Sequence, residues 1–424
     1  FFFRAIMLRS VCAATAAVGL VFWWRHKTNT KKKDESSPFN ERTLRQFIAT
    51  HPRKQALLAV LGGAHGSDWQ VEEVSDGNIN YVFVVTGPKG SLCVKQSVPH
   101  LRKFTAFKLS EMRVFFEYSA LKLHNRLAPS LSPSAVLFDG GHNAIVMECL
   151  RPHIILRRGL MQQQQYPQLS EHVGEFLARS LFFTSDWGMP AADKRQLVHK
   201  YSGNSFMCRL TEEVVFTCPY STHPSFPNSV SPGLAAVAEA VIGDTALKQR
   251  VSELKLLFLS SCEALCHGDL HTGSLMVTQT DTKVIDAEFA FMGPVAFDPA
   301  LFVANLMLAY FASGPSTQHH EECQQEQQCQ QAGGRHEEWI LQCAVEVWEK
   351  FSLKFCRLWA QRDKAAAGGG GGREQQEQQE QQAEQEEQED QEEGGGGGDK
   401  AATAVGNGDA YPPALFTSSS SSSS

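Results

Sequence analysis

The sequence predicts an α+β fold of two lobes, with an N-terminal five-stranded antiparallel sheet plus one helix and a mainly α-helical C-terminal lobe. Short β-rich runs separated by Gly, Pro and Asp turns fill the chain as far as Leu150, and helical periodicity dominates beyond it. A polar hairpin between His267 and Glu288 interrupts these helices. With 424 residues, the chain is long enough to bury a core in each lobe.

In the first lobe, alternating apolar runs predict strands at residues 69–74, 81–85, 91–95, 135–138 and 144–149. Helices are expected at residues 40–61, ending at Gly62-Gly63, and at residues 111–127. In the second lobe, the apolar periodicity predicts helices at residues 169–184, 192–201, 234–242, 246–265, 299–312 and 337–361.

Composition restricts the partners and the compartment. A net charge of −7 gives no support for a nucleic-acid partner, because binding to a phosphate backbone requires a basic face. The 11 cysteines contain no C-x-x-C pair, so neither a zinc ribbon nor a dithiol redox site is indicated. Such an unpatterned set fits a reducing compartment, and we expect a cytoplasmic protein.

The N-terminal segment leaves two interpretations open. Residues 11–24 are almost wholly apolar, and a basic linker follows as far as residue 39. Fourteen residues are short for a membrane span, which needs about 20. The segment is therefore either a signal anchor or transit peptide, with membrane contact through residues 11–24, or a dispensable extension.

Low-complexity sequence interrupts and follows the second lobe. Gln and Glu dominate residues 321–331 and 374–393, and glycine and serine runs fill much of the remainder after residue 367. Such stretches cannot bury enough apolar surface to offset chain entropy, so we expect disorder, with a Gln/Glu helix as the alternative. The expected organisation is a nucleotide-binding lobe at 40–150, a catalytic lobe at 151–361 with an insert at 321–334, and a tail at 362–424.

The hairpin carries the most informative chemistry. His267-Gly268-Asp269 opens a polar loop, residues 274–278 and 282–285 read as two strands, and the second strand ends at Asp286 with Glu288 close behind. This arrangement can hold Asp269 near a substrate hydroxyl while Asp286 and Glu288 hold Mg²⁺ on a nucleotide, as phosphoryl transfer requires. Each Asp taken alone could be an ordinary turn residue. Together with the β-then-α order they favour a protein-kinase-like fold.

Histidines in this loop do not indicate zinc, because the neighbouring carboxylates favour Mg²⁺. We expect His267 to bond backbone carbonyls and order the loop.

Candidate nucleotide contacts lie in the first lobe. The turn containing Asp76 and Gly77 could cover phosphates, although such residues also form plain hairpin turns. Lys95 ends a strand and could reach phosphates, or could be a solvated strand end. Glu117 could pair with Lys95, or could be a surface charge. Glu148, Cys149 and Leu150 occupy the position of a kinase hinge, or of a plain connector.

At these residues the chain resembles the methylthioribose kinase family, part of the aminoglycoside-phosphotransferase-like kinases. The similarity extends from about residue 72 to residue 310, a little over half the chain. Ser274 is a family marker, because most relatives in the wider superfamily carry Asn at that position. The matching blocks include D-G-N-I-N-Y-V-F-V-V, V-K-Q-S-V-P, P-H-I-I-L-R-R-G-L, C-R-L-T-E-E-V-V-F-T-C-P-Y, H-G-D-L-H-T-G-S-L-M-V-T and T-K-V-I-D-A-E-F-A-F-M-G-P-V-A-F-D.

The resemblance implies ATP-dependent phosphorylation of the C1 hydroxyl of S-methyl-5-thioribose in methionine salvage, with ATP and Mg²⁺ as cofactors and a homodimer as the assembly. It implies that Asp269 is the catalytic base and the sugar contact. Asp286 and Glu288 would hold the metal, with Ser274 as a weaker ligand. The implied ATP contacts are Asp76, Gly77, Asn80, Lys95, Glu117, Glu148, Cys149, Leu150, Asp286, Ala287 and Glu288.

Three departures from the family pattern bear on these expectations. Ala287 replaces a proline, and the segment G-E-S-W-P after the lysine strand is missing. The sugar-binding motif R-R-(I/T)-(I/V)-G-(L/V)-A-H is absent, and Arg157-Arg158 falls in a different family block. We therefore expect a C-terminal truncation. Another aminoglycoside- or choline-kinase-like enzyme, and an ATP-binding pseudoenzyme without the arginine pair, remain as alternatives.

Overall fold

The computed structural model describes residues 38–63, 66–74, 79–100, 108–222, 228–313 and 326–367. The chain divides into two units after Phe39, and both lobes belong to the unit that begins at Asn40. The apolar segment 11–24 and the Gln/Glu tract 374–393 lie outside the described residues, so the expectations for them stay predictions. No helix within the described ranges is long and apolar enough to cross a membrane.

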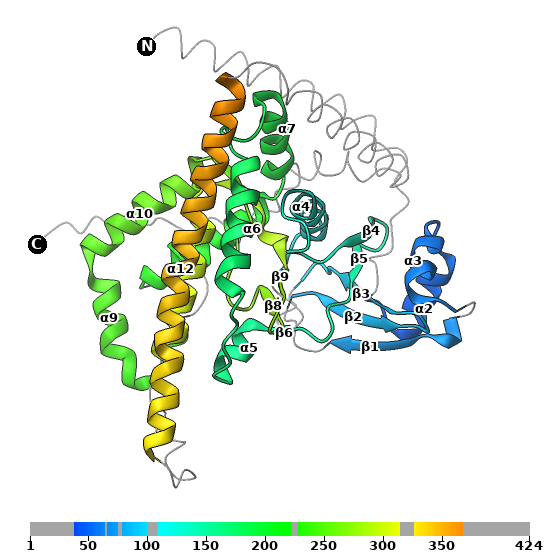
Figure 1. Cartoon of the computed structure of the whole chain (residues 1–424), viewed down its shortest axis with the longest axis horizontal. Helices are drawn as coiled ribbons and strands as arrows, with labels where there is room; N and C mark the ends of the chain where they lie inside the picture. Colours follow the sequence, from blue (N-terminus) through cyan, green and yellow to red (C-terminus); the bar gives the residue numbers. More distant parts are fainter. Residues whose placement is uncertain are drawn as a thin grey trace, which may run out of the picture. The chain divides into compact units, whose positions relative to one another are not determined.

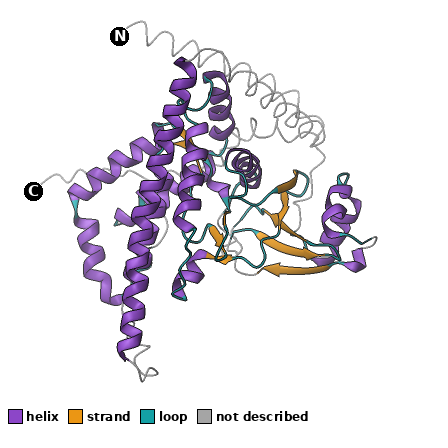
Figure 2. Cartoon of the chain, in the orientation of Figure 1, coloured by secondary structure: helices purple, strands orange, loops and turns teal. Residues whose placement is uncertain are grey.

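The first lobe is the predicted five-stranded antiparallel sheet (Figures 1 and 2). Its strands stand in the order β1-β2-β3-β5-β4, so the lysine strand β3 lies in the centre. Helix α4 covers the sheet, with Val114, Tyr118 and Leu121 packed on Ile145 and Met147. The elements are β1 Gln70–Val74, β2 Tyr81–Thr86, β3 Ser91–Gln96, α4 Arg113–Leu127, β4 Ala135–Asp139 and β5 Ala144–Glu148.

The single helix expected at residues 40–61 is wrong, because the structure has two. Helix α2 (Glu41–Thr50) begins with a capping box between Asn40 and Thr43, and α3 (Lys54–Leu61) follows. The break falls at His51-Pro52, where the proline ring disfavours the helical conformation of the residue before it.

The second lobe is built around a long helix. Helix α12 (Glu326–Ala367) runs beside α6 (Leu169–Phe183) and also packs against α11 (Phe297–Ala312) (Figure 1). These helices share one apolar core, to which they contribute Phe176, Leu177, Phe302, Ile340 and Val347. The shorter helical elements of this lobe are α5 Leu156–Met161, α7 Ala191–Ser202, α8 Ser205–Phe216, α9 Ala235–Gly243, α10 Thr245–Ser260, and the 3₁₀ turns η2 Cys218–Tyr220 and η3 Pro232–Leu234. The 3₁₀ turn η1 Gly66–Asp68 belongs to the first lobe.

Two helix boundaries in this lobe differ from the prediction, the end of α10 and the start of α12. The helix expected at 246–265 is α10, which stops at Ser260, and Ala264–Cys266 instead form strand β7 paired with β10 (Phe291–Gly293). A three-residue apolar run fits a strand or a helix equally well, and the pairing with β10 decides it. Helix α12 begins at Glu326, so residues 326–331 are helical instead of disordered; Gln and Glu are good helix formers once a packed helix continues them. Helices α5 and α8 were not predicted.

The acidic hairpin has the predicted form. Strands β8 (Leu275–Val277) and β9 (Thr282–Val284) pair antiparallel, and β6 (Ile154–Ile155) adds a third strand. The 3₁₀ turn η4 (Ala287–Phe289) follows and packs against α4, so the hairpin joins the two lobes.

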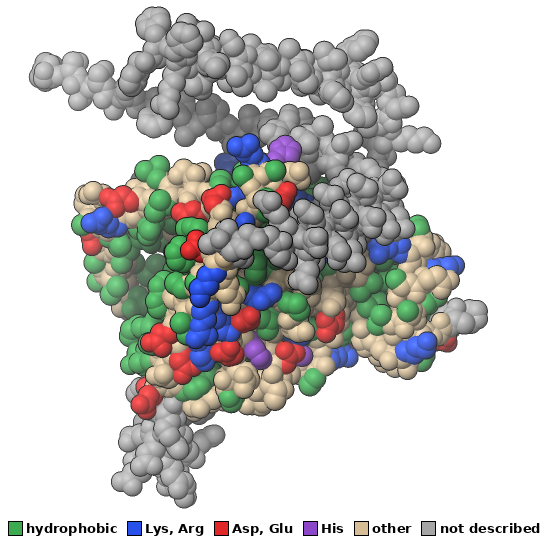
Figure 3. Space-filling view, turned by 45° about the horizontal axis from the view of Figure 1, so that its top comes forward, with side chains coloured by type: hydrophobic (Ala, Val, Ile, Leu, Met, Phe, Trp, Pro, Cys, Tyr) green, Lys and Arg blue, Asp and Glu red, His purple; other side chains and the backbone are tan. Residues whose placement is uncertain are grey.

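Apolar side chains are exposed on the helical lobe (Figure 3). On α10, Leu254, Leu256 and Leu259 are each more than half exposed, and α9 has no buried residue.

Candidate active site

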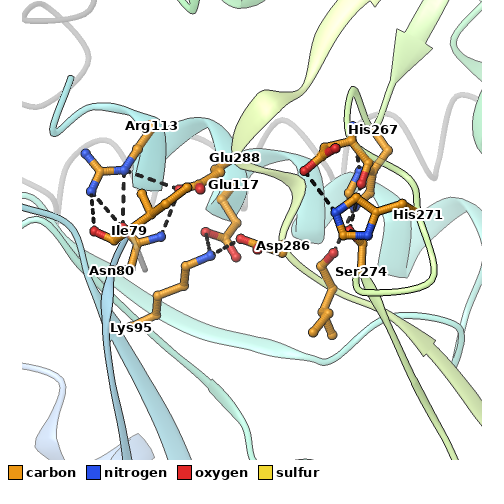
Figure 4. Close-up of polar contacts among 12 residues, drawn as sticks. Ile79, Asn80, Lys95, Arg113, Glu117, His267, His271, Ser274, Asp286 and Glu288 are labelled. Carbon is orange, nitrogen blue, oxygen red and sulfur yellow. Dashed lines mark hydrogen bonds and ion pairs between the residues drawn. The ribbon is translucent and has the colours of Figure 1, made fainter. Parts of the chain in front are cut away.

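A group of charges lies where the two lobes meet, and all of them except Asp286 are buried (Figure 4). Lys95 comes from β3, Glu117 from α4, and Asp286 from the end of the hairpin. The Lys95 Nζ lies 2.7 Å from Glu117 Oε2, and it also forms an ion pair and hydrogen bond with Asp286. The pairing of Lys95 with Glu117 expected from the sequence is therefore present.

Glu288 completes the group from the side of η4. Its side chain is buried, and its Oε2 accepts a hydrogen bond of 2.9 Å from Asn80 Nδ2. Among the described residues, Glu117, Asp286 and Glu288 form a cluster whose carboxylate oxygens lie within 4.8 Å of one another. Hard carboxylate oxygens at this spacing suit Mg²⁺, so the donor set fits the metal expected from the sequence.

The pKa shifts have electrostatic causes. Burial alone would lower the pKa of the Lys95 ammonium, but the carboxylates of Asp286, Glu117 and Glu288 outweigh it and raise that pKa. Burial raises the pKa of Glu117 and of Glu288, and Asp286 adds to both. Burial also acts on Asp286, but the charge of Lys95 outweighs it and lowers the pKa of that carboxyl. An added divalent cation would favour the ionised form of all three carboxyls.

Arg113 belongs to this site and was missed. Its side chain is fully buried at the start of α4, and its guanidinium donates to Asn80 Oδ1 at 2.8 Å and to the carbonyls of Val98 and Ser110. It also lies 3.3 Å from Glu288 Oε2. The sequence gives no signal for this role, because an arginine in the first turn of a helix is usually solvated.

These contacts bear on the predicted role of Asn80 as an ATP contact. The sequence places Asn80 among the ATP contacts, and the structure holds its amide between Arg113 and Glu288. A phosphate contact from this side chain remains a prediction. Asp76 and Gly77, from the same turn, lie outside the described residues.

The backbone conformation of Asp286 directs its side chain toward the cluster. Asp286 adopts the left-handed conformation, with φ 69° and ψ 45°, between β9 and η4. Asp tolerates this conformation better than most non-glycine residues. Ala287, next in the chain, is buried against Phe116 and Ala120 of α4, so it lies in the apolar core behind the site.

The loop that carries Asp269 is held by Asp298, at the start of α11. The backbone N–H groups of His267 and Gly268 donate to its two carboxylate oxygens, at 2.6 and 3.0 Å. The His267 Nε2 bonds the carbonyl of Ile285 at 2.9 Å, which confirms that this histidine orders the loop. Gly268 has φ 85°, and a Cβ there would lie 2.2 Å from the Phe289 carbonyl oxygen, so the position requires glycine.

Asn305 of α11 holds the other end of the loop. Its Oδ1 accepts from the backbone N–H of Thr272 at 3.0 Å and from the Thr272 hydroxyl at 2.5 Å. Neither Asp298 nor Asn305 was predicted as part of the site. The only available signal was their spacing of seven residues, which places both on one face of a helix.

The Asp269 side chain is 41% exposed, as open as Asp286 at 47% and unlike the buried Glu117 and Glu288, and its Oδ2 lies 3.4 Å from His271 Nε2. Ser274 donates its hydroxyl to the Asp269 carbonyl at 2.7 Å. That bond directs the hydroxyl to the loop backbone, and a metal contact from Ser274 remains the weaker prediction.

The connector between the lobes begins where the sequence predicts a hinge. Glu148 ends β5, and its Oε2 accepts from the backbone N–H of Ser134 at 3.0 Å. Cys149 and Leu150 are partly exposed. Contacts of these three residues with adenine remain a prediction.

The fold and this site define a phosphotransferase. Residues 70–330 match the phosphotransferase enzyme family APH. Methylthioribose kinase 1 of Oryza sativa subsp. japonica is 40% identical over 326 residues, which is 76% of this chain and 72% of that protein. Methylthioribose kinase of Escherichia coli is 40% identical over 299 residues, 70% of this chain and 69% of that protein. The chain therefore belongs to the methylthioribose kinase family.

Among solved structures, an ethanolamine kinase of Plasmodium vivax is similar, with a TM-score of 0.41 and 14% identity over 79% of this chain and 91% of that chain.

Proposed function

We propose that this chain phosphorylates the C1 hydroxyl of S-methyl-5-thioribose with ATP, a step of methionine salvage. The observation that supports this most directly is one hairpin that joins a buried cation-and-carboxylate cluster to a loop with a half-exposed aspartate, in a member of this family. Phosphoryl transfer depends mainly on positioning and charge, and these two features would supply both.

We assign the nucleotide to the buried cluster. Lys95, held by Glu117, would bind the phosphates, as a lysine at the end of a central strand does in kinases. Asp286 and Glu288 would hold Mg²⁺, which supplies charge neutralisation on the phosphates when bound. The hinge at Glu148, Cys149 and Leu150 would bind the adenine.

We assign the acceptor sugar to the loop. Asp269 would orient the C1 hydroxyl and accept its proton as the hydroxyl oxygen attacks the γ-phosphorus of ATP. The bond from that phosphorus to the β–γ bridging oxygen breaks, and ADP leaves. A half-exposed carboxylate suits this task, because a general base must reach within hydrogen-bond distance of the proton it removes.

The test is phosphorylation of methylthioribose by the purified chain with ATP and Mg²⁺, with the product identified as a C1 phosphate ester by ³¹P NMR. Asp269→Asn is the matched control, because it keeps the shape and removes the base. We expect turnover from the wild type alone. Equal turnover by both proteins would disprove the assignment of the base.

A substrate panel separates this proposal from its alternatives. Turnover of choline or an aminoglycoside, and none of methylthioribose, would identify a different small-molecule kinase. Binding of ADP by calorimetry without binding of methylthioribose would identify a nucleotide-binding protein that lacks the activity.

The proposal extends to the assembly and the compartment. Family membership supports a homodimer, which sedimentation would detect. The described cysteines are all free thiols, which supports a reducing, cytoplasmic compartment.

A further inference from the structure

His271 lies between Asp269 and an arginine from another element, Arg157. Its Nε2 is 3.4 Å from Asp269 Oδ2, and its Nδ1 is 3.2 Å from Nη2 of Arg157, in the first turn of α5. The backbone N–H of Gly273 also donates to Nδ1, at 2.8 Å. The Ser274 Oγ lies 3.4 Å from Nδ1 as well, with its hydroxyl donated to the Asp269 carbonyl. The imidazole thus has two N–H donors and a more distant hydroxyl on one side and a carboxylate on the other.

The donors on Nδ1 determine where the ring proton lies. A backbone N–H and a guanidinium can donate but cannot accept, so Nδ1 must present its lone pair to both. In a neutral imidazole the other nitrogen then carries the hydrogen. The hydrogen of His271 is therefore on Nε2, the nitrogen that faces Asp269.

The surroundings are built for this orientation. The backbone N–H of Arg157 donates to the Thr272 carbonyl at 2.8 Å, so α5 is bound to the loop by its backbone as well as by its side chain. A Cβ on Gly273 would lie 2.5 Å from His271 Cε1 and 2.6 Å from Arg157 Nη2. Gly273 therefore leaves the space in which the ring and the guanidinium meet.

We propose that His271 is a positioning residue for Asp269, with its Nε2–H directed to Oδ2 so that the other carboxylate oxygen is presented to the acceptor hydroxyl. Arg157 acts one step further out, by fixing the ring through Nδ1. This inference rests on the proposed role of Asp269 as the base. At 3.4 Å the contact is longer than a strong hydrogen bond, and such contacts commonly tighten when substrate binds.

Two substitutions separate the two sides of the ring. In His271→Asn the amide oxygen takes the place of Nδ1 and accepts from Gly273, but the side chain is too short to reach Asp269. In His271→Gln the amide nitrogen reaches the place of Nε2 and donates to Asp269. We expect kcat to fall about 100-fold in His271→Asn, because a misplacement of about 1 Å at the reacting group costs that much. Most of the loss should return in His271→Gln, with the KM for ATP unchanged in both.

A spectroscopic arm tests the tautomer without substrate. In the ¹⁵N spectrum of histidine-labelled protein, His271 should show a protonated Nε2 and an unprotonated Nδ1, with the resonance assigned by its loss in His271→Asn. A protonated Nδ1 would overturn the proposal. So would wild-type kcat in a folded His271→Asn, with folding checked by urea denaturation.

The two proposals fail in different ways. If the wild type does not phosphorylate methylthioribose, the proposed function fails, and the Asp269 positioning role fails with it. The tautomer assignment is then still decided by NMR. If the wild type is active and the Asn and Gln variants are equally impaired, only the positioning role is wrong.

Discussion

The buried cluster and the catalytic loop place their carboxylates by different means. In the cluster, Lys95, Glu117 and Glu288 have side chains no more than 8% exposed and Asp286 is 47% exposed, and each is paired with an opposite charge from another element. In the loop, the Asp269 side chain is 41% exposed, and the backbone on both sides of it is fixed. The metal carboxylates are thus positioned by charge pairing across both lobes, and the base by hydrogen bonds within one lobe.

This difference follows from what each region must do. Buried charges interact strongly, but each is costly if its partner is lost. A general base must stay accessible to its substrate, so its support has to come from the chain that carries it. Substitutions in the cluster should therefore weaken nucleotide and metal binding, whereas substitutions in the loop should lower turnover.

The largest difference between the effects on turnover and on nucleotide binding is expected from Asp269→Asn. Removing the base should lower kcat by about 10³-fold, within the range known for general acid–base catalysis. Binding of ADP with Mg²⁺, measured by calorimetry, should be unchanged, because Asp269 is not one of the three clustered carboxylates. A large loss of ADP affinity would show that the two regions are not separate.

Arg113→Met tests the cluster. The change leaves Glu288 and Asn80 without their buried partner, and breaking a buried ion pair costs about 3 kcal/mol or more. Urea denaturation should show this loss, and the Mg²⁺ concentration needed for half-maximal turnover should rise. Arg113→Lys keeps the charge but loses the planar fork of donors, so it should restore only part of the stability.

Asp298→Asn tests the support of the loop. Each Asp298 oxygen accepts from one backbone N–H, and the amide NH2 that replaces one of these oxygens can only donate, so one charge-assisted hydrogen bond is lost, at about 2 kcal/mol. We expect kcat to fall about tenfold at constant ADP affinity, in stopped assays and calorimetry. A change confined to ADP binding would contradict the division between the regions.

Asn305→Ala removes the second support. Thr272 loses the acceptor for its backbone N–H and its hydroxyl, at about 2 kcal/mol, because Thr272 is buried and these groups are left without a partner. The expected effect on kcat is less than that of Asp298→Asn, because Thr272 lies further from Asp269 along the loop than Gly268 does.

The smallest effect is expected at an exposed pair away from both regions. Arg151 lies 2.7 Å from Glu72, and both side chains are more than half exposed. Arg151→Ala should change the free energy of unfolding by no more than about 0.5 kcal/mol. A change as large as that of Arg113→Met would mean that burial does not explain the stability of the cluster.

The parts of the fold that the sequence predicted correctly depend on local patterns. The five strands of the first lobe are bounded by turn residues, and the hairpin has a polar turn between two apolar runs. The errors occur where a local pattern is ambiguous. Ala264–Cys266 is too short to have a period, and its pairing with β10 makes it a strand.

The same limit explains which site residues were missed. Lys95, Asp269 and Asp286 stand at strand ends and loops in recognisable motifs. Arg113 and Asp298 act only through contacts that folding creates. Arg113 and Asn80, for example, are 33 residues apart in the chain, and Arg113 Nη2 lies 2.8 Å from Asn80 Oδ1 in space. The sequence does not show these partners, so an arginine in the first turn of a helix cannot be distinguished from an ordinary surface charge.

The attachment of the loop to α11 has a consequence for any attempt to exchange parts between related enzymes. Asp298 and Asn305 are seven residues apart, which is about 10.5 Å along a helix. A loop that is hydrogen-bonded to the helix at two points this far apart cannot rotate about either point. The loop therefore moves together with the helix. Inserting or deleting one residue between them would turn one attachment by about 100° relative to the other. A transplant of the loop should therefore include the first three turns of α11 as a single cassette.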